Sequence, residues 1–327
     1  MSQPNDSPQL NSPTLTDLAD SQEYSQADSQ PDYILYAQHG WADIDRGIGS
    51  LAQQVASPKA RAVVPNLGFV NTWLRIEPLI ERVEKIAAQT QREYPDTPMR
   101  IIGHSMGGLI WLEVLDRHPE WWPLVESLVL VGSPVGGADL SRMVDPMGWG
   151  IGIARDLGKN RRAMAEKIAA QVPTLIIAAD YSQGSDGVVP IECMKFNQAS
   201  YIEVGSIRHD QMKRHPVVAD AIKQFWQHKE RLCVPMPVET YSYRVIQRLQ
   251  AIPGMTDARY RGFEKSDLWS LLPHGLALRT RQNKVGIHHV YLSNDMGDCL
   301  FSGYVGWPNT ADLYDALCRL RCDESLL

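Results

Sequence analysis

Short apolar runs alternate with helix-like segments from residue 33 to about residue 230. The apolar runs have the length of buried strands, and the segments between them carry apolar residues every three or four positions. The predicted strands are residues 33–37, 62–65, 99–102, 127–131, 173–179 and 199–204. Because strands that alternate with helices are joined by crossover connections, the pattern predicts an α/β fold with a mostly parallel sheet covered by helices on both faces.

Helical spacing is clearest in residues 75–93, which have one apolar face. The residues of that face are Ile76, Leu79, Ile80, Val83, Ile86 and Ala87. The Tyr-Pro-Asp-Thr-Pro cluster at 94–98 ends this helix, because proline cannot continue it. Helices are also predicted from Leu109 to Leu115 and over residues 216–228, whereas the stretch between the first two strands reads as a short polar connector.

The pattern changes after Pro235 and Pro237. The elements predicted beyond them are helices over residues 242–251 and 310–320 and strands over residues 276–280, 287–292 and 299–305. No motif assigns a role to this part of the chain. We therefore predict an α/β region of residues 32–234, followed by a small α+β extension of residues 235–327 whose role is unknown.

Residues 1–31 are rich in Ser, Gln, Pro, Asp and Asn and contain few apolar side chains, which is typical of a disordered segment. The acidic residues among the first 33 are Asp6, Asp17, Asp20, Glu23, Asp28 and Asp32, with no Lys or Arg. Since the whole chain has a net charge of −6, its remainder is close to neutral. A neutral body without a dense basic stripe argues against a nucleic-acid partner.

No apolar run approaches the roughly 18 residues that a membrane-spanning helix needs. The first residues also lack the basic patch and apolar stretch of a secretory signal. The cysteines form no zinc-binding pattern and lie at scattered positions: Cys193, Cys233, Cys299, Cys318 and Cys322. An odd number of scattered cysteines is most easily explained by a reducing, cytoplasmic location, which we therefore expect.

Ser105 is the candidate nucleophile. It lies in Gly-His-Ser-Met-Gly at residues 103–107, between a predicted strand and a predicted helix. Glycines on both sides permit the strained turn that lifts a serine hydroxyl above the end of a sheet, with a helix N-terminus beneath it. The pentad alone is a weak signal, but a strand, the pentad and a helix in succession are typical of a nucleophilic serine.

A nucleophilic serine needs a base, which should follow the last strand of the sheet. His209 occupies that place. His215 is the main alternative, but it precedes Pro216 at the start of the next predicted helix. His104 is beside the nucleophile in sequence, and its side chain should point away from it into the packing between sheet and helix. We therefore predict that His209 is the base.

The acid that orients the base should lie between these two residues, after a strand. Asp186 lies in the turn that follows the strand ending at Ala179. Asp180 is the alternative, although aspartate at the end of a strand is often only a turn former. Asp186 is favoured, and the chain order Ser105, Asp186, His209 is the one expected for this triad on an α/β fold.

Backbone N–H groups are the candidates for an oxyanion hole. One is that of Met106, directly after the nucleophile. The second should come from the loop after the first strand, Gln-His-Gly-Trp at 38–41, and there the N–H of Trp41 is favoured. His39 is interpreted as structural.

Several segments together resemble the α/β-hydrolase-fold lipases and esterases, in particular bacterial lipase-like proteins. They are Gln-His-Gly-Trp at 38–41, Gly-His-Ser-Met-Gly-Gly at 103–108, Ser-Pro-Val-Gly-Gly at 133–137, Asp-Gly-Val-Val-Pro at 186–190, and His209. The resemblance spans residues 33 to about 230. It implies hydrolysis of carboxylic esters through an acyl-enzyme, a small-molecule acyl ester or lipid as substrate, and neither a metal nor an organic cofactor. The acidic tail and the extension from 235 onward have no counterpart in it.

Residues 139–170 form an insertion between two predicted strands, where lids of this fold often lie. It contains Met143, Val144, Met147, Trp149, Ile151 and Ile153, with glycines at 148, 150 and 152. A flexible apolar segment of this kind would suit an acyl chain. The alternative is an ordinary connection whose apolar side chains are permanently buried.

Four functions other than ester hydrolysis stay open at this point. Acyl transfer, thioester hydrolysis and amide hydrolysis use the same constellation, because a fold does not determine a reaction. A non-catalytic binding or scaffold protein is the fourth, in which the extension would recruit a partner. The presence of candidates for nucleophile, base, acid and oxyanion hole favours an enzyme.

Overall fold

Six parallel strands form the central sheet of the first part of the chain, in the order β2-β1-β3-β4-β5-β6. The computed structural model describes residues 30–137, 153–182, 184–228 and 240–322. The strands are β1 (Ile34–Gln38), β2 (Arg61–Val63), β3 (Met99–His104), β4 (Val125–Val131), β5 (Thr174–Ala178) and β6 (Ser200–Glu203). The predicted parallel sheet is thus confirmed, with each strand within a few residues of its expected position.

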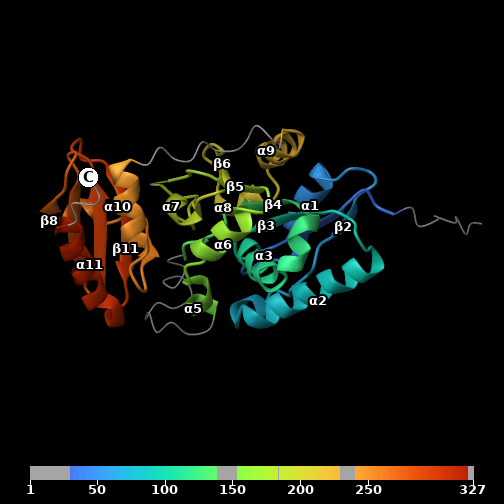
Figure 1. Cartoon of the computed structure of the whole chain (residues 1–327), viewed down its shortest axis with the longest axis horizontal. Coiled ribbons are helices and arrows are strands. Elements are labelled where there is room, and N and C mark those ends of the chain that lie inside the picture. Colours follow the sequence, from blue (N-terminus) through green and yellow to red (C-terminus); the bar gives the residue numbers. More distant parts are fainter. Residues whose placement is uncertain (1–29, 138–152, 183, 229–239, 323–327) are drawn as a thin grey trace, which may run out of the picture. The chain divides into compact units, whose positions relative to one another are not determined.

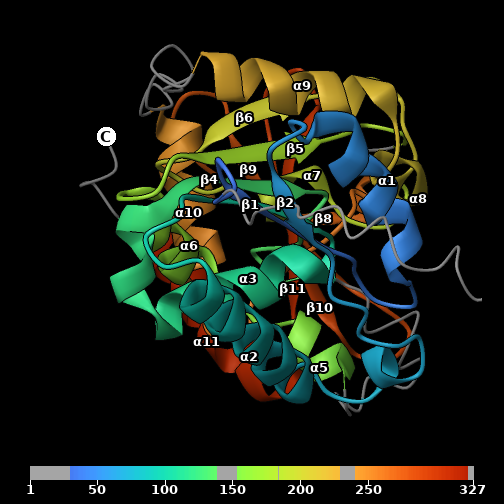
Figure 2. The same ribbon diagram turned by 90° about the vertical axis from the view of Figure 1, so that its right-hand side faces the viewer.

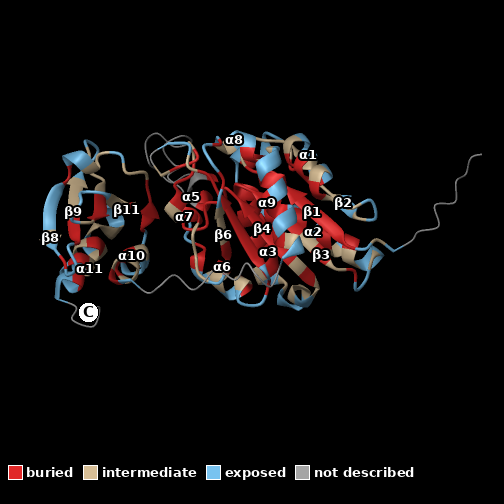
Figure 3. Ribbon diagram, turned by 90° about the horizontal axis from the view of Figure 1, so that it is seen from above, coloured by how far each residue is buried: buried red, intermediate tan, exposed pale blue. Residues whose placement is uncertain are grey.

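Helices cover both faces of this sheet (Figures 1 and 2). On one face lie α1 (Asp45–Val55) and α9 (Pro216–Gln227), and on the other lie α2 (Glu77–Glu93), α3 (Met106–Arg117) and α6 (Arg162–Ala169). Alternate residues of β1, β3 and β4 join the apolar cluster on one face or the other, as in β1, where Ile34 and Tyr36 face α2 and α3 while Leu35 and Ala37 face α1 and α9. Figure 3 shows the inner strands of this sheet buried, whereas exposed residues lie on the edge strand β2, on the outer sides of the helices and in the loops.

The prediction of a polar connector between the first two strands was wrong, because α1 occupies it. Its buried residues Ile48, Leu51, Ala52 and Val55 follow the i, i+3, i+4, i+7 spacing of an amphipathic helix. Two glycines in the helix, at 47 and 49, lower its intrinsic helix propensity. Packing of the apolar stripe against the sheet outweighs that cost.

A second, antiparallel sheet follows, in the order β7-β11-β10-β9-β8. Its strands are β7 (Thr256–Asp257), β8 (Asp267–Leu271), β9 (Ala277–Gln282), β10 (His288–Ser293) and β11 (Cys299–Val305). Helices α10 (Tyr241–Gln250) and α11 (Thr310–Cys322) share one apolar cluster with this sheet. The predicted α+β extension is confirmed, although β7 and β8 were not predicted. A strand of two residues leaves no pattern, and Leu268, Trp269 and Leu271 of the edge strand β8 are all exposed.

The insertion predicted at residues 139–170 is described only from residue 153 onward. Its first helix there is α5 (Ile153–Leu157), in which both terminal residues are fully buried in the cluster under α2 and α3. The methionines and the tryptophan on which the lid interpretation depended lie outside the described residues. The lid itself therefore stays a prediction.

Shorter elements connect the main ones. Over the described residues they are α7 (Ile191–Met194), α8 (His209–Met212) and the short 3-10 helices η1 (Asn71–Trp73), η2 (Pro119–Leu124), η3 (Phe263–Lys265) and η4 (Trp307–Asn309). In the parts of the chain that the structure describes, no helix combines the length and apolar character needed to cross a membrane.

Candidate active site

Ser105 lies at a sharp turn between β3 and α3, where a nucleophile elbow is expected. Its backbone angles are φ +54° and ψ −125°, and its N–H donates to the carbonyl of Val131 at the end of β4 (2.9 Å). A residue other than glycine with positive φ is strained and persists only where its surroundings impose that conformation. Here the strand on one side and the helix on the other impose it, which is the arrangement that exposes a serine hydroxyl at the end of a sheet.

The glycines around Ser105 are required by close packing. A Cβ atom at Gly107 would lie 2.3 Å from the carbonyl oxygen of Gln38, and one at Gly103 would lie 2.4 Å from the Cα of Gly108. The first turn of α3 therefore lies directly against the end of β1 and against its own preceding strand. Side chains at these positions would push the helix away and displace Ser105.

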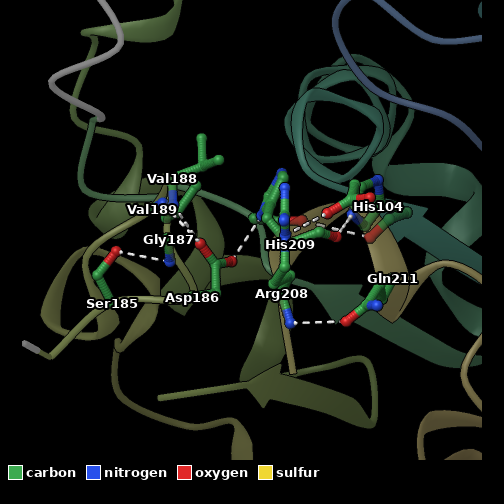
Figure 4. Close-up of polar contacts among 12 residues, drawn as sticks. His104, Ser185, Asp186, Gly187, Val188, Val189, Arg208, His209 and Gln211 are labelled. Atoms are coloured by element: carbon green, nitrogen blue, oxygen red, sulfur yellow. Dashed lines mark hydrogen bonds and ion pairs between the residues drawn. The ribbon is translucent and has the colours of Figure 1, made fainter. Parts of the chain in front are cut away.

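Asp186 and His209 form a short hydrogen bond. His209 Nδ1 lies 2.6 Å from Oδ2 of Asp186, and the backbone N–H of His209 donates to the carbonyl of Asp186 (2.9 Å). The other carboxylate oxygen, Oδ1, accepts from the N–H groups of Val188 (2.9 Å) and Val189 (2.7 Å). Asp186 is fully buried, and the side chain of His209 is 11% exposed. A buried carboxylate bonded on both oxygens has a defined orientation, and it holds the imidazole with its Nδ1 proton toward the acid (Figure 4).

His209 is held from its other side by His104, which sequence reasoning did not foresee. His104 Nε2 lies 3.0 Å from the carbonyl oxygen of His209, so this nitrogen carries the proton and donates it, and the ring centroids are 4.7 Å apart. Burial, with the neighbouring His209 next, holds the pKa of His104 well below its ordinary value of 6.5. The histidine of the Gly-His-Ser-Met-Gly motif is therefore neutral and fixes the backbone of the candidate base (Figure 4).

His104 has a consequence for stability that can be measured. Because its pKa is lowered in the folded state, the unfolded chain binds a proton below about pH 6.5 where the folded chain does not. The stability that neutral His104 contributes is thus present above that pH and is lost as the pH falls, by at most about 1.4 kcal/mol per pH unit. We expect the free energy of unfolding, measured in urea, to fall less steeply from about pH 7 to pH 5 in His104→Gln than in the native chain. The exposed His228→Gln is the control, and equal slopes for the native chain and His104→Gln would contradict the assignment.

The loop after β1 lies against the elbow, where the oxyanion hole was predicted. A Cβ at Gly40 would lie 2.8 Å from Ser105 Cβ and 3.2 Å from the backbone N of Met106. His39 is buried and fixes the loop: its Nδ1 donates to the carbonyl of Gly40 (3.1 Å), and its Nε2 accepts from the N–H of Leu67 (3.1 Å). Burial lowers the pKa of His39, which suits this neutral role. Met106 opens α3, and the first N–H groups of a helix have no acceptor within it.

Gly132 connects these parts. It follows β4, next to the Val131 that accepts from Ser105, and a Cβ there would lie 3.1 Å from Asp186 Oδ2 and 3.2 Å from His209 Nδ1. The elbow, the acid and the base therefore meet at the carboxyl ends of neighbouring parallel strands. The alternative candidates, Asp180 and His215, are not part of this hydrogen-bonded pair. Asp186, and not Asp180, bonds His209, and the side chain of His215 accepts from the N–H of Val217 at the start of α9.

An exposed apolar cluster lies beside the predicted oxyanion loop. The rings of Trp41 and Trp73 are 4.4 Å apart, and the N–H of Ala42 donates to the hydroxyl of Thr72 (3.0 Å). The apolar residues exposed in this segment are Phe69 (50%), Val70 (71%), Trp73 (40%) and Leu74 (62%). The sequence offered no signal for it, because the segment has no periodicity. Over the described residues, no group of three or more His, Cys, Asp or Glu side chains is placed to hold a metal ion.

A parallel sheet flanked by helices, with a strained serine turn between β3 and α3, defines an α/β hydrolase. The comparison with protein families agrees. Residues 71–238 match the family described as serine aminopeptidase, S33, and the chain belongs to that family of hydrolases. The matched segment contains Ser105, Asp186 and His209, whereas Trp41 precedes it.

Solved structures of similar fold include lipases, esterases and a thioesterase. A Bacillus licheniformis lipase, BlEst2, is 13% identical, covers 61% of this chain and 93% of its own, and has a TM-score of 0.47. Est1E from Butyrivibrio proteoclasticus with bound ferulic acid is 12% identical, covers 62% and 91%, and has a TM-score of 0.48. The thioesterase domain from the curacin biosynthetic pathway is 15% identical, covers 61% and 92%, and has a TM-score of 0.39. The comparison with curated proteins produced no match.

Proposed function

We propose that this hydrolase cleaves carboxylic esters through an acyl-enzyme formed on Ser105. The observation that carries the proposal is the 2.6 Å bond between buried Asp186 and His209 Nδ1, at the same end of the sheet as a serine in an elbow conformation. That bond leaves Nε2 of His209 as the proton acceptor, which is the arrangement a serine nucleophile requires.

Each residue then has one role in the reaction. His209 takes the proton of the Ser105 hydroxyl as its Oγ attacks the ester carbonyl, and the backbone N–H groups of Trp41 and Met106 bind the oxyanion that forms. The tetrahedral intermediate collapses, the alcohol leaves with the proton from His209, and an acyl-serine remains. Water, activated in the same way by His209, releases the acid, while Asp186 stabilises the imidazolium in both halves.

The substrate that fits the surroundings is a small ester with an apolar substituent. Trp41 bears one of the proposed oxyanion donors, and the exposed cluster around Trp73 begins directly beside it. Exposed aromatic and aliphatic side chains next to a reaction centre favour apolar substrates, because burying them releases water from both surfaces.

Thioester hydrolysis and amide hydrolysis use the same parts and are decided by the same experiment. Acyl transfer also uses these parts, and product formed on an added alcohol acceptor faster than hydrolysis would favour it. The family is described by a serine aminopeptidase, so amide substrates belong in the test. The purified chain should be offered p-nitrophenyl esters of increasing acyl length, an acyl thioester, and aminoacyl p-nitroanilides. We expect turnover of the esters, with a preference for acyl chains longer than acetyl.

A fluorophosphonate probe separates the nucleophile from the choice of substrate. Phosphonylation forms an Oγ–P bond and releases fluoride, and it needs a competent serine and base without any substrate preference. Labelling of Ser105 with turnover of anilides alone would replace ester hydrolysis by amide hydrolysis. A folded chain that neither reacts with the probe nor hydrolyses any of the three classes would overturn the proposal and favour a non-catalytic role.

A further inference from the structure

The segment after β7 touches the loop that carries Asp186. The guanidinium of Arg259 donates a hydrogen bond to the carbonyl oxygen of Gly187, the residue directly after Asp186. One position further, the ring of Tyr260 lies against the other end of the loop, where a Cβ at Gly184 would be 3.2 Å from a ring carbon. Part of the antiparallel-sheet extension thus contacts the turn around the candidate acid.

A buried ion pair reinforces this contact. Asp257 of β7 is fully buried and lies 2.5 Å from the guanidinium of Arg162 in α6. The same guanidinium donates to the carbonyls of Glu192 (3.0 Å) and Lys195 (3.1 Å), which belong to or directly follow α7. Helix α7 continues from the Asp186 loop, so that loop is held at Gly187 by Arg259 and at its far end by Arg162 and Asp257.

The hydrogen bond from Arg259 to the Gly187 carbonyl affects the neighbouring N–H group that donates to Asp186. The Gly187 carbonyl and the Val188 N–H belong to one peptide unit, which is planar and trans, so the two groups point in opposite directions. The Val188 N–H is the group that donates to Asp186 Oδ1 (2.9 Å). A cation that holds the carbonyl therefore fixes the plane in which the N–H is aimed at the carboxylate, and it also polarises the peptide so that the N–H becomes a stronger donor.

We propose that Arg259 is a positioning residue for the triad, through which the extension completes the active site. This inference rests on the proposed function, since it assigns Arg259 to the same Asp186 and His209. Without Arg259 the Gly187–Val188 peptide can rotate, the carboxylate loses a fixed donor, and the imidazole that it orients is held less well. Glycine at 187 has φ +97°, a conformation that offers little resistance to such a rotation, because no side chain restrains it.

The test compares Arg259→Ala, Arg259→Lys and, as a matched control, Arg319→Ala on the exposed side of α11. We expect Arg259→Ala to lower kcat by roughly 10- to 100-fold with KM changed by less than about threefold, as for a misplaced catalytic group. The acidic limb of its pH–rate profile should move to lower pH, because an imidazolium with a poorly oriented partner loses its proton more easily. Arg259→Lys keeps a cation and one donor and should recover most of kcat, and Arg319→Ala should behave as the native chain.

The rate of fluorophosphonate labelling provides a second readout that needs no substrate. It should fall in Arg259→Ala by a factor similar to kcat, at an unchanged midpoint of thermal unfolding. If the native chain labels but turns over no ester, the proposed function fails while the labelling rates still decide the role of Arg259. Native kcat, pH profile and labelling rate in Arg259→Ala would overturn the inference, and so would a loss that Arg259→Lys does not recover.

Discussion

Replacing Ser105 with alanine is expected to lower ester turnover by at least about 10⁴-fold and to leave the fold intact. The change removes only Oγ, and since alanine keeps the Cβ, the strain of φ +54° is the same before and after. The hydrogen bond that holds the elbow, from its N–H to the carbonyl of Val131, also remains, and the space beside Gly40 is unchanged because no atom is added there. What is lost is the atom proposed to form the acyl bond, and the expected residual rate is that of water attack assisted by the proposed oxyanion donors.

The measurement is kcat/KM for the best p-nitrophenyl ester, with thermal unfolding followed on the same samples. Ser50→Ala, on the exposed side of α1, is the matched control and should keep full activity. An alanine variant at 105 that retains more than a tenth of native turnover would show that another residue is the nucleophile.

Replacing Asp186 with asparagine is expected to lower kcat by about 10³- to 10⁴-fold, while Asp180→Asn should change it less than about threefold. Asp186 accepts the Nδ1 proton of His209 and two backbone N–H groups. An amide of the same shape would present either a donor to Nδ1, which selects the wrong tautomer, or an oxygen without the charge that stabilises the imidazolium. Asp180 lies just after β5, and among the described residues it forms no hydrogen bond or ion pair with His104 or His209, because Asp186 is the partner of His209.

Both variants should be compared by kcat and by the rate of fluorophosphonate labelling, which depends on the base but not on the leaving alcohol. Circular dichroism should be unchanged for each. A larger loss of kcat in Asp180→Asn than in Asp186→Asn would show that Asp186 is not the acid of the triad.

The sheet and the chain order of the candidate site could be predicted because they depend on local patterns. Buried parallel strands are short apolar runs, and a serine between two glycines at a strand–helix junction is itself a local signal. Asp186 and His209 were predicted as acid and base from their order along the chain, since the ends of successive parallel strands lie at one edge of a sheet.

What could not be predicted depends on contacts between distant segments. His104 bonds the backbone of His209, and Arg259 bonds the backbone of Gly187. Because every residue has a backbone carbonyl, the type of the accepting residue gives no sign of such a bond in the sequence. The exposed cluster around Trp73 has no periodicity, and α1 carries glycines that obscure a helix whose stability comes from packing. In each case tertiary structure outweighs a local preference.

The order in which the chain is synthesised gives the contact between Arg259 and Gly187 a further meaning. His209, the last of the three candidate residues to be synthesised, precedes Arg259 by about 50 residues, and at 5–20 residues per second that interval lasts roughly 2.5–10 s. During it, Ser105, Asp186 and His209 can all be present in a nascent α/β sheet whose acid loop is not yet held. If Arg259 has the role proposed for it, the chain passes through a stage in which the catalytic residues are assembled but catalysis is weak, and full activity arises only when the antiparallel sheet forms.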